Sequence, residues 1–90
     1  METIARFVPE AGEQRESRRG EDENGLYFLE TEVEGENGKA EYTYMAKGEH
    51  PIGGSASETA IHVTYYDADG IPEGGRSVAK LVDGEWQPTP

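Results

Sequence analysis

The histidines and serines of this 90-residue chain form no recognisable catalytic or metal-binding pattern. His50 and His62 are the only histidines, and no fixed spacing links them, so a metal site would need carboxylates brought to them by the fold. The serines occur only in segments rich in glycine or arginine, which supports no Ser-His-Asp assignment. The absence of cysteine excludes a thiol nucleophile and a cysteine-ligated metal. We therefore predict no catalytic residues and no metal site, and we favour a non-enzymatic function.

Three glycine-containing segments predict no ligand site. Asp67-Ala68-Asp69-Gly70 shares two acidic positions and a glycine with calcium loops, but it lacks their full spacing and their bidentate glutamate. The same residues are typical of a type I turn in which Gly70 takes a positive φ. Gly53-Gly54 and Gly74-Gly75 belong to neither GxxxxGK nor GxGxxG, so they predict no phosphate cradle. We predict no cofactor.

A row of glutamates is the best candidate for a binding site. Side chains alternate between the two faces of a strand, so acids spaced by two residues share a face. Such a face is either a solvated surface or a site for a basic protein partner. The candidate residues are Glu30, Glu32, Glu34 and Glu41.

The net charge of −11 limits the possible partners. Nucleic acid and anionic lipid are bound through basic patches, so we predict neither direct nucleic-acid binding nor membrane binding. Besides an ordinary acidic surface, the charge is compatible with a salt-adapted host or with a protein that mimics nucleic acid. No apolar run approaches the roughly 20 residues of a membrane span, and residues 1–6 do not resemble a secretory signal. The expected location is the cytoplasm.

The N-terminal quarter is predicted to lie outside the main domain. Residues 1–8 contain a short apolar run, stopped by Pro9, that could be an edge strand. Residues 9–25 have almost no apolar side chain, so they are predicted to be a disordered linker. The arginines of this segment could instead be ordered by an acidic partner. Residues 26–90 form the predicted small β domain.

Two hairpins are predicted from turn dipeptides. Asn37-Gly38 and Asp83-Gly84 are both type I′ signals. For the first hairpin we predict the apolar pairs Val33 with Tyr42, Thr31 with Tyr44 and Leu29 with Ala46. For the second we predict Leu81 opposite Trp86 and Ala79 opposite Pro88, with Lys80 and Gln87 on the other face.

The central strand is predicted over residues 59–67, the longest β-branched and aromatic run of the chain. Ile61, Val63 and Tyr65 share the expected core face. The expected fold is therefore mainly β: a small antiparallel sheet, or an open barrel or sandwich, with five to six strands built from two hairpins. An unprotected edge in so small a sheet allows either a monomer or an edge-paired homodimer.

Two short segments resemble known families. Residues 63–70, VTYYDADG, resemble a strand-turn signature of FxLyD-type bacterial β-sandwich domains, which implies a binding or adhesion-like module, usually extracytoplasmic. Residues 38–44, GKAEYTY, look like the first central strand of very small GNAT-type acetyltransferases, in which a glycine-rich turn opens a helix at the acetyl-CoA pyrophosphate. Residues 74–80 are similar to that turn, and the implied helix would have to cross Asp83-Gly84 and stop at Pro88. No functional residue is carried over from either family.

Three functions follow, in order of preference. The first is a small acidic protein-interaction module. The second is a minimal acyl-CoA-dependent N-acetyltransferase, and the third is an acidic nucleic-acid mimic.

Overall fold

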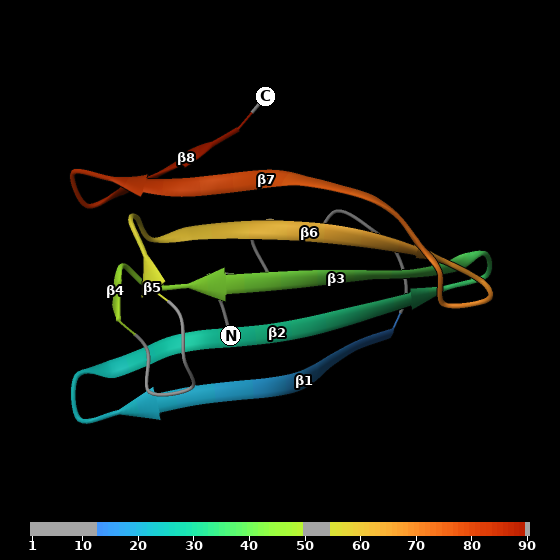
Figure 1. Ribbon diagram of the computed structural model, residues 1–90, viewed down its shortest axis with the longest axis horizontal. Coiled ribbons are helices and arrows are strands. Elements are labelled where there is room, and N and C mark those ends of the chain that lie inside the picture. Colours follow the sequence, from blue (N-terminus) through green and yellow to red (C-terminus); the bar gives the residue numbers. More distant parts are fainter. Residues whose placement is uncertain (1–12, 50–54, 90) are drawn as a thin grey trace.

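The computed structural model describes residues 13–49 and 55–89, which are almost entirely extended (Figure 1). This part of the chain contains eight strands and no helix. The strands are β1 (Glu13–Asp22), β2 (Gly25–Gly35), β3 (Gly38–Met45), β4 (Gly48–Glu49), β5 (Ser55–Ala56), β6 (Ala60–Asp67), β7 (Pro72–Val82) and β8 (Glu85–Pro88). The mainly β class predicted from the sequence is confirmed, whereas the predicted edge strand within residues 1–8 lies outside the described residues.

Six of the strands form one antiparallel sheet in the order β1-β2-β3-β6-β7-β8. Figure 1 shows this order from β1 at one edge to β8 at the other, with the small β4-β5 ladder beside one end. β6 contains the segment expected to be central, and it lies between β3 and β7. No helix of the described segments is long and apolar enough to cross a membrane.

One face of the sheet carries the hydrophobic core. Ile61 and Val63 are essentially inaccessible there, and Tyr65 packs against them, as the alternation along β6 predicts. Tyr42 is the largest fully buried side chain. Trp86 of β8 is half-buried, and its ring centroid lies 6.2 Å from that of Tyr44 on β3. Since β6 and β7 separate these strands in the sheet, the two rings reach toward each other across the core face.

The β2-β3 hairpin corrects the predicted register. Gly35 pairs with Gly38, so the two loop residues are Glu36 and Asn37 rather than Asn37 and Gly38. Neither loop residue has a positive φ, so this is not the predicted type I′ turn. Gly38 is needed within β3, which pairs with β6 in the sheet. A Cβ on Gly38 would come 2.0 Å from the Tyr66 carbonyl oxygen of β6, so only glycine allows the two backbones to lie this close. The register moves by two residues in total, which preserves the assignment of side chains to faces. The observed apolar-face pairs are Leu29 with Tyr44, Thr31 with Tyr42 and Val33 with Ala40.

Part of the predicted disordered linker, residues 9–25, is an edge strand. Glu13–Asp22 forms β1 and pairs antiparallel with β2. Asp22 pairs with Gly25, and the Asp22 carboxylate accepts a hydrogen bond from the Asn24 N–H at 2.8 Å, which stabilises the turn. Low apolar content does not prevent order here, because β1 is held by backbone pairing and charge contacts, which need no buried apolar side chain.

The C-terminal hairpin agrees with its prediction. Leu81 pairs with Trp86 and Ala79 with Pro88, and both turn residues, Asp83 and Gly84, have positive φ as a type I′ turn requires. The strand before it, β7, begins at Pro72, and its pairing with β6 contains two register shifts.

Candidate functional site

The four candidate glutamates lie on the sheet face opposite the core. Glu30, Glu32 and Glu34 alternate with the core-facing residues of β2, and Glu41 of β3 is directly opposite Glu32. The structure therefore brings together the residues that the sequence pattern grouped. It also adds basic residues to the same face, which the alternation along β2 does not predict. We call this surface, made of the four glutamates with Arg15, Arg18 and Lys39, the charged face.

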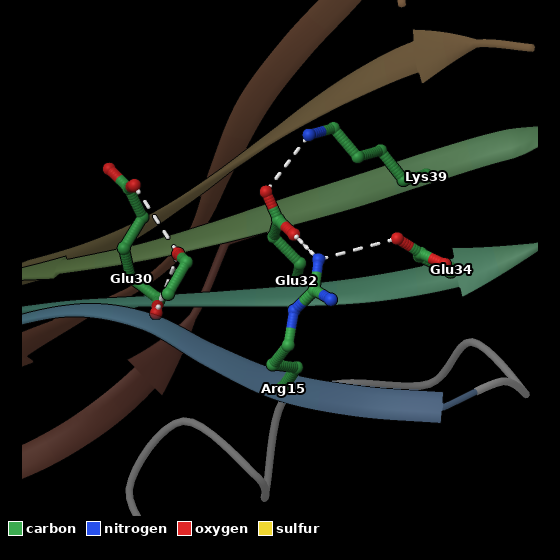
Figure 2. A network of polar contacts seen from close by, with 6 residues as sticks. Arg15, Glu30, Glu32, Glu34 and Lys39 are labelled. Atoms are coloured by element: carbon green, nitrogen blue, oxygen red, sulfur yellow. Dashed lines mark hydrogen bonds and ion pairs between the residues drawn. The ribbon is translucent and has the colours of Figure 1, made fainter.

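Glu32 is the centre of the charged face. Its side chain is only 11% exposed, and its two carboxylate oxygens are held by different cations. Oε2 lies 2.6 Å from a guanidinium nitrogen of Arg15, and Oε1 lies 2.9 Å from Nζ of Lys39. Figure 2 shows the two cations approaching from opposite sides. These hydrogen bonds, first that from Arg15 and then that from Lys39, lower the pKa of Glu32 and keep it ionised.

Glu34 and Glu30 are held more loosely. Arg15 also reaches Glu34 at 3.4 Å, so one guanidinium lies between two carboxylates of β2 (Figure 2). The Ser17 hydroxyl donates to the Glu30 backbone carbonyl at 3.1 Å and lies 3.4 Å from its carboxylate. Neither glutamate is buried, so both keep carboxylate oxygens available to a further donor.

Glu41 is in a different electrostatic environment from Glu32. Partial burial raises its pKa, and the nearby Glu30 charge raises it further, whereas Lys39 and a hydrogen bond with Tyr66 act in the opposite direction. Its neighbour Lys39 also lies over the Tyr66 ring, 5.1 Å from the centroid. Glu41 is thus a partly desolvated carboxylate that would gain from a closer cation.

β1 supplies the arginines of the charged face. Arg15 and Arg18 pair with Glu32 and Glu30 in the β1-β2 register, and the Arg18 guanidinium lies 5.0 Å from the Phe28 ring centroid. The acidic partner that could order this segment is the chain's own β2. A sequence signal for this strand exists: Glu-Asn-Gly occurs at residues 23–25 and again at 36–38, and both copies connect two antiparallel strands.

The structure does not bring the other described candidate residues together. His62 is exposed on β6, and His50 lies outside the described residues. No group of three or more potential metal ligands occurs in residues 13–49 and 55–89. The Asp67 carboxylate accepts hydrogen bonds from the N–H groups of Asp69 and Ile71, both at 2.9 Å, and Gly70 has φ +80°. The motif is therefore a turn, as predicted.

Two shallow hollows lie at the end of the sheet where β2 meets β3. Their volumes are about 350 and 260 Å³, and both include Glu36, Gly38 and Lys39 in their lining. Glu73 borders the larger hollow and Asp67 the smaller. This end of the sheet therefore extends the negative charge beyond the charged face.

Comparison of the chain with models of protein families, with curated proteins and with solved structures finds no match. The fold also differs from what the two resemblances imply. Ser77–Val82 belongs to β7 and Glu85–Pro88 is β8, so the helix that a GNAT-type pyrophosphate site requires is not formed. The six main strands make one sheet rather than the two facing sheets of a sandwich.

Proposed function

We propose that this protein is a small, non-enzymatic interaction module whose charged face binds a basic segment of another protein. The contact that supports this function is the one between Arg15 and the carboxylates of Glu32 and Glu34. One nitrogen of the Arg15 guanidinium reaches both carboxylates, so glutamates two residues apart along β2 can share one cation, and a guanidinium offers further donors in a planar fork to such a row. The net charge of −11 would also speed the approach of a basic partner.

The nucleic-acid mimic is less well supported by this geometry. A surface that imitates a phosphate backbone needs an uninterrupted row of negative charge. Arg15 and Lys39 interrupt the row at its most buried member, Glu32. A protein partner with separate arginines suits such an alternating surface better.

We further propose that the partner is cytoplasmic. The module itself is either a monomer or a homodimer paired through a strand edge.

The test uses a fluorescein-labelled peptide of four Ser-Arg repeats and its Ser-Lys counterpart. We expect the arginine peptide to bind more tightly, because lysine offers no planar pair of donors. A triple variant, Glu30→Gln with Glu34→Gln and Glu41→Gln, should weaken binding about tenfold, from roughly 0.5 kcal/mol for each charge removed. Glu32 is left intact because its removal would disturb the fold. Fluorescence anisotropy at low salt and at 0.15 M salt measures the affinities.

A matched control separates the site from the bulk charge. The triple variant Glu23→Gln, Glu49→Gln and Glu85→Gln removes the same number of charges from exposed positions outside the charged face. We expect it to bind within about twofold of the unmodified protein, since distant exposed charges are screened. Equal losses in the two triple variants would show that the peptide responds only to net charge, and the proposed site would be wrong.

A further inference from the structure

β1 is held to the sheet without any apolar anchor. The described strand Glu13–Asp22 has the sequence EQRESRRGED, and none of its residues belongs to the hydrophobic core or packs against it. Every residue of β1 except Gly20 is exposed. Burial of apolar surface is the main source of local stability, so a strand without it opens at low free-energy cost.

The pairing of β1 with β2 is also less regular than that on the other side of β2. The β1-β2 ladder is interrupted twice, between Glu16 and Arg18 and between Gly20 and Glu21. The β2-β3 ladder runs without interruption from Phe28–Met45 to Gly35–Gly38. The contacts that add to the β1 ladder are ionic or polar, and solvent and salt weaken them. β1 is therefore an edge strand held to the sheet mainly by backbone pairing and by contacts that solvent and salt weaken.

Removal of β1 would leave a vacancy with defined chemistry. The outer backbone edge of β2 would lose its partner, and Glu32 would keep Lys39 but lose its contact with Arg15. An extended peptide that adds to a sheet edge satisfies the backbone groups, and its alternate side chains give specificity. The vacancy thus selects an extended segment that carries a guanidinium opposite Glu32.

Two more positions of β1 define the segment that fits. Arg18 places its guanidinium over the Phe28 ring, so a second arginine belongs three residues after the first. Gly20 lies against Tyr27: a Cβ at this position would come within 2.5 Å of the Tyr27 ring. A glycine therefore belongs two residues after the second arginine.

From these contacts we infer that β1 is an internal, displaceable occupant of the charged face. The partner is a protein segment of the pattern Arg-x-x-Arg-x-Gly that binds in extended form along β2 in place of β1. This inference rests on the proposed function and adds the partner's sequence class and its mode of binding. It also makes β1 autoinhibitory, because the partner competes with a strand of the same chain.

The probe is a labelled peptide, QQRQSRRGQN, which is β1 with its four acids replaced by amides. A covalent lock tests whether β1 must leave. Glu16 and Thr31 are directly opposed, with side chains away from the charged face, and the chain has no cysteine of its own. The double variant Glu16→Cys, Thr31→Cys can therefore be oxidised to a single disulfide at a separation that such a bond can span.

We expect the reduced variant to bind the probe and the oxidised variant to bind it at least tenfold more weakly. Equal binding by both forms would overturn strand replacement but leave the proposed function standing, since the peptide would then lie over β1. If the Ser-Arg peptide binds and the probe does not, the inferred pattern is wrong. If neither peptide binds the unmodified protein, the proposed function itself fails.

Hydrogen exchange on the unmodified protein gives a second readout that needs no engineered bond. Saturation with the probe should remove the protection of the β1 amides while those of β3 and β6 stay protected. Continued protection of β1 at saturation would overturn the inference. The probe with alanine at its glycine should bind more weakly, because the end of the Tyr27 side chain would have to move aside to admit a Cβ.

Discussion

Glu32→Gln tests whether the pairing at the centre of the charged face stabilises the fold. The substitution keeps the shape of the side chain but removes a carboxylate that is 11% exposed and holds two cations, at 2.6 and 2.9 Å. Hydrogen bonds to charged groups contribute about 1.5–3 kcal/mol each, whereas fully exposed ion pairs contribute about 0–1 kcal/mol. The Arg15 and Lys39 side chains remain 62% and 33% exposed, so solvent screens both contacts. We expect the loss of both contacts together to lower the free energy of unfolding by about 2 kcal/mol.

Thermal unfolding followed by circular dichroism measures this loss. For a domain of this size, about 2 kcal/mol corresponds to a Tm lower by roughly 10 °C at pH 7 and low salt. Because the pKa of Glu32 is lowered in the folded state, its stabilisation is present above the ordinary glutamate pKa and is lost as the pH falls through the folded-state value. The difference in Tm between the two proteins should therefore begin to narrow below about pH 4.

Glu34→Gln is the matched control, because Glu34 is 60% exposed and its contact with Arg15 is 3.4 Å long. We expect its Tm to stay within about 2 °C of that of the unmodified protein. If Glu32→Gln behaved like this control at pH 7, the ion pairs of Glu32 would contribute nothing measurable to stability. A difference in Tm that persisted unchanged at pH 3 would show that charge is not its cause.

Two further substitutions test the sheet around the site. Gly38→Ala should destabilise the protein by about 3 kcal/mol or more, because φ is +139° there and the new Cβ would lie 2.0 Å from a β6 carbonyl oxygen. Its control is Gly35→Ala, whose Cβ would meet nothing closer than 3.8 Å and which should change the free energy of unfolding by less than about 0.5 kcal/mol. Urea unfolding measures both, and similar values for the two variants would refute the close-approach explanation. Glu41→Gln should raise the Tm at pH 7, because partial burial and the Glu30 charge raise the pKa of Glu41, so that its ionised form is destabilising at neutral pH. This gain should disappear below about pH 4, where Glu41 is protonated, and a lower Tm at pH 7 would contradict the assignment.

The parts of the fold that the sequence predicts correctly are those in which local turn chemistry and side-chain alternation agree. Asp83-Gly84 lies between two short runs that pair without interruption, and both residues adopt the positive φ that a type I′ turn requires. The separation of apolar and acidic side chains onto two faces of β2 also follows from alternation alone. The sequence therefore places the glutamates on one face correctly, although the predicted β2-β3 register differs from the observed one by two residues.

The sequence-based predictions are wrong where contacts with a neighbouring strand, and not local turn preferences, determine the structure. Asn37-Gly38 predicts a loop of these two residues, but Gly38 is needed where β3 passes the backbone of β6, a contact that no local pattern encodes. The composition of β1 does not predict a strand, because it lacks apolar residues. The charges on β2 that contact β1 come close to it only in the folded register. The central role of Glu32 could not be predicted for the same reason, since Arg15 and Lys39 meet it from different strands.

The strand order has a consequence for how the chain folds. In the main sheet each strand pairs with the next main-sheet strand along the sequence, and only the segment between Met45 and Ala60 forms a longer connection. Most contacts therefore form by closing short loops, for which the loss of chain entropy is small. Proteins with such low contact order fold faster than β-sandwiches of similar size, whose strands pair across long stretches of sequence. We expect the β2-β3 and β6-β7 hairpins to form first, because their loops are short, and the β3-β6 pairing to join them, with β1 among the last strands to add.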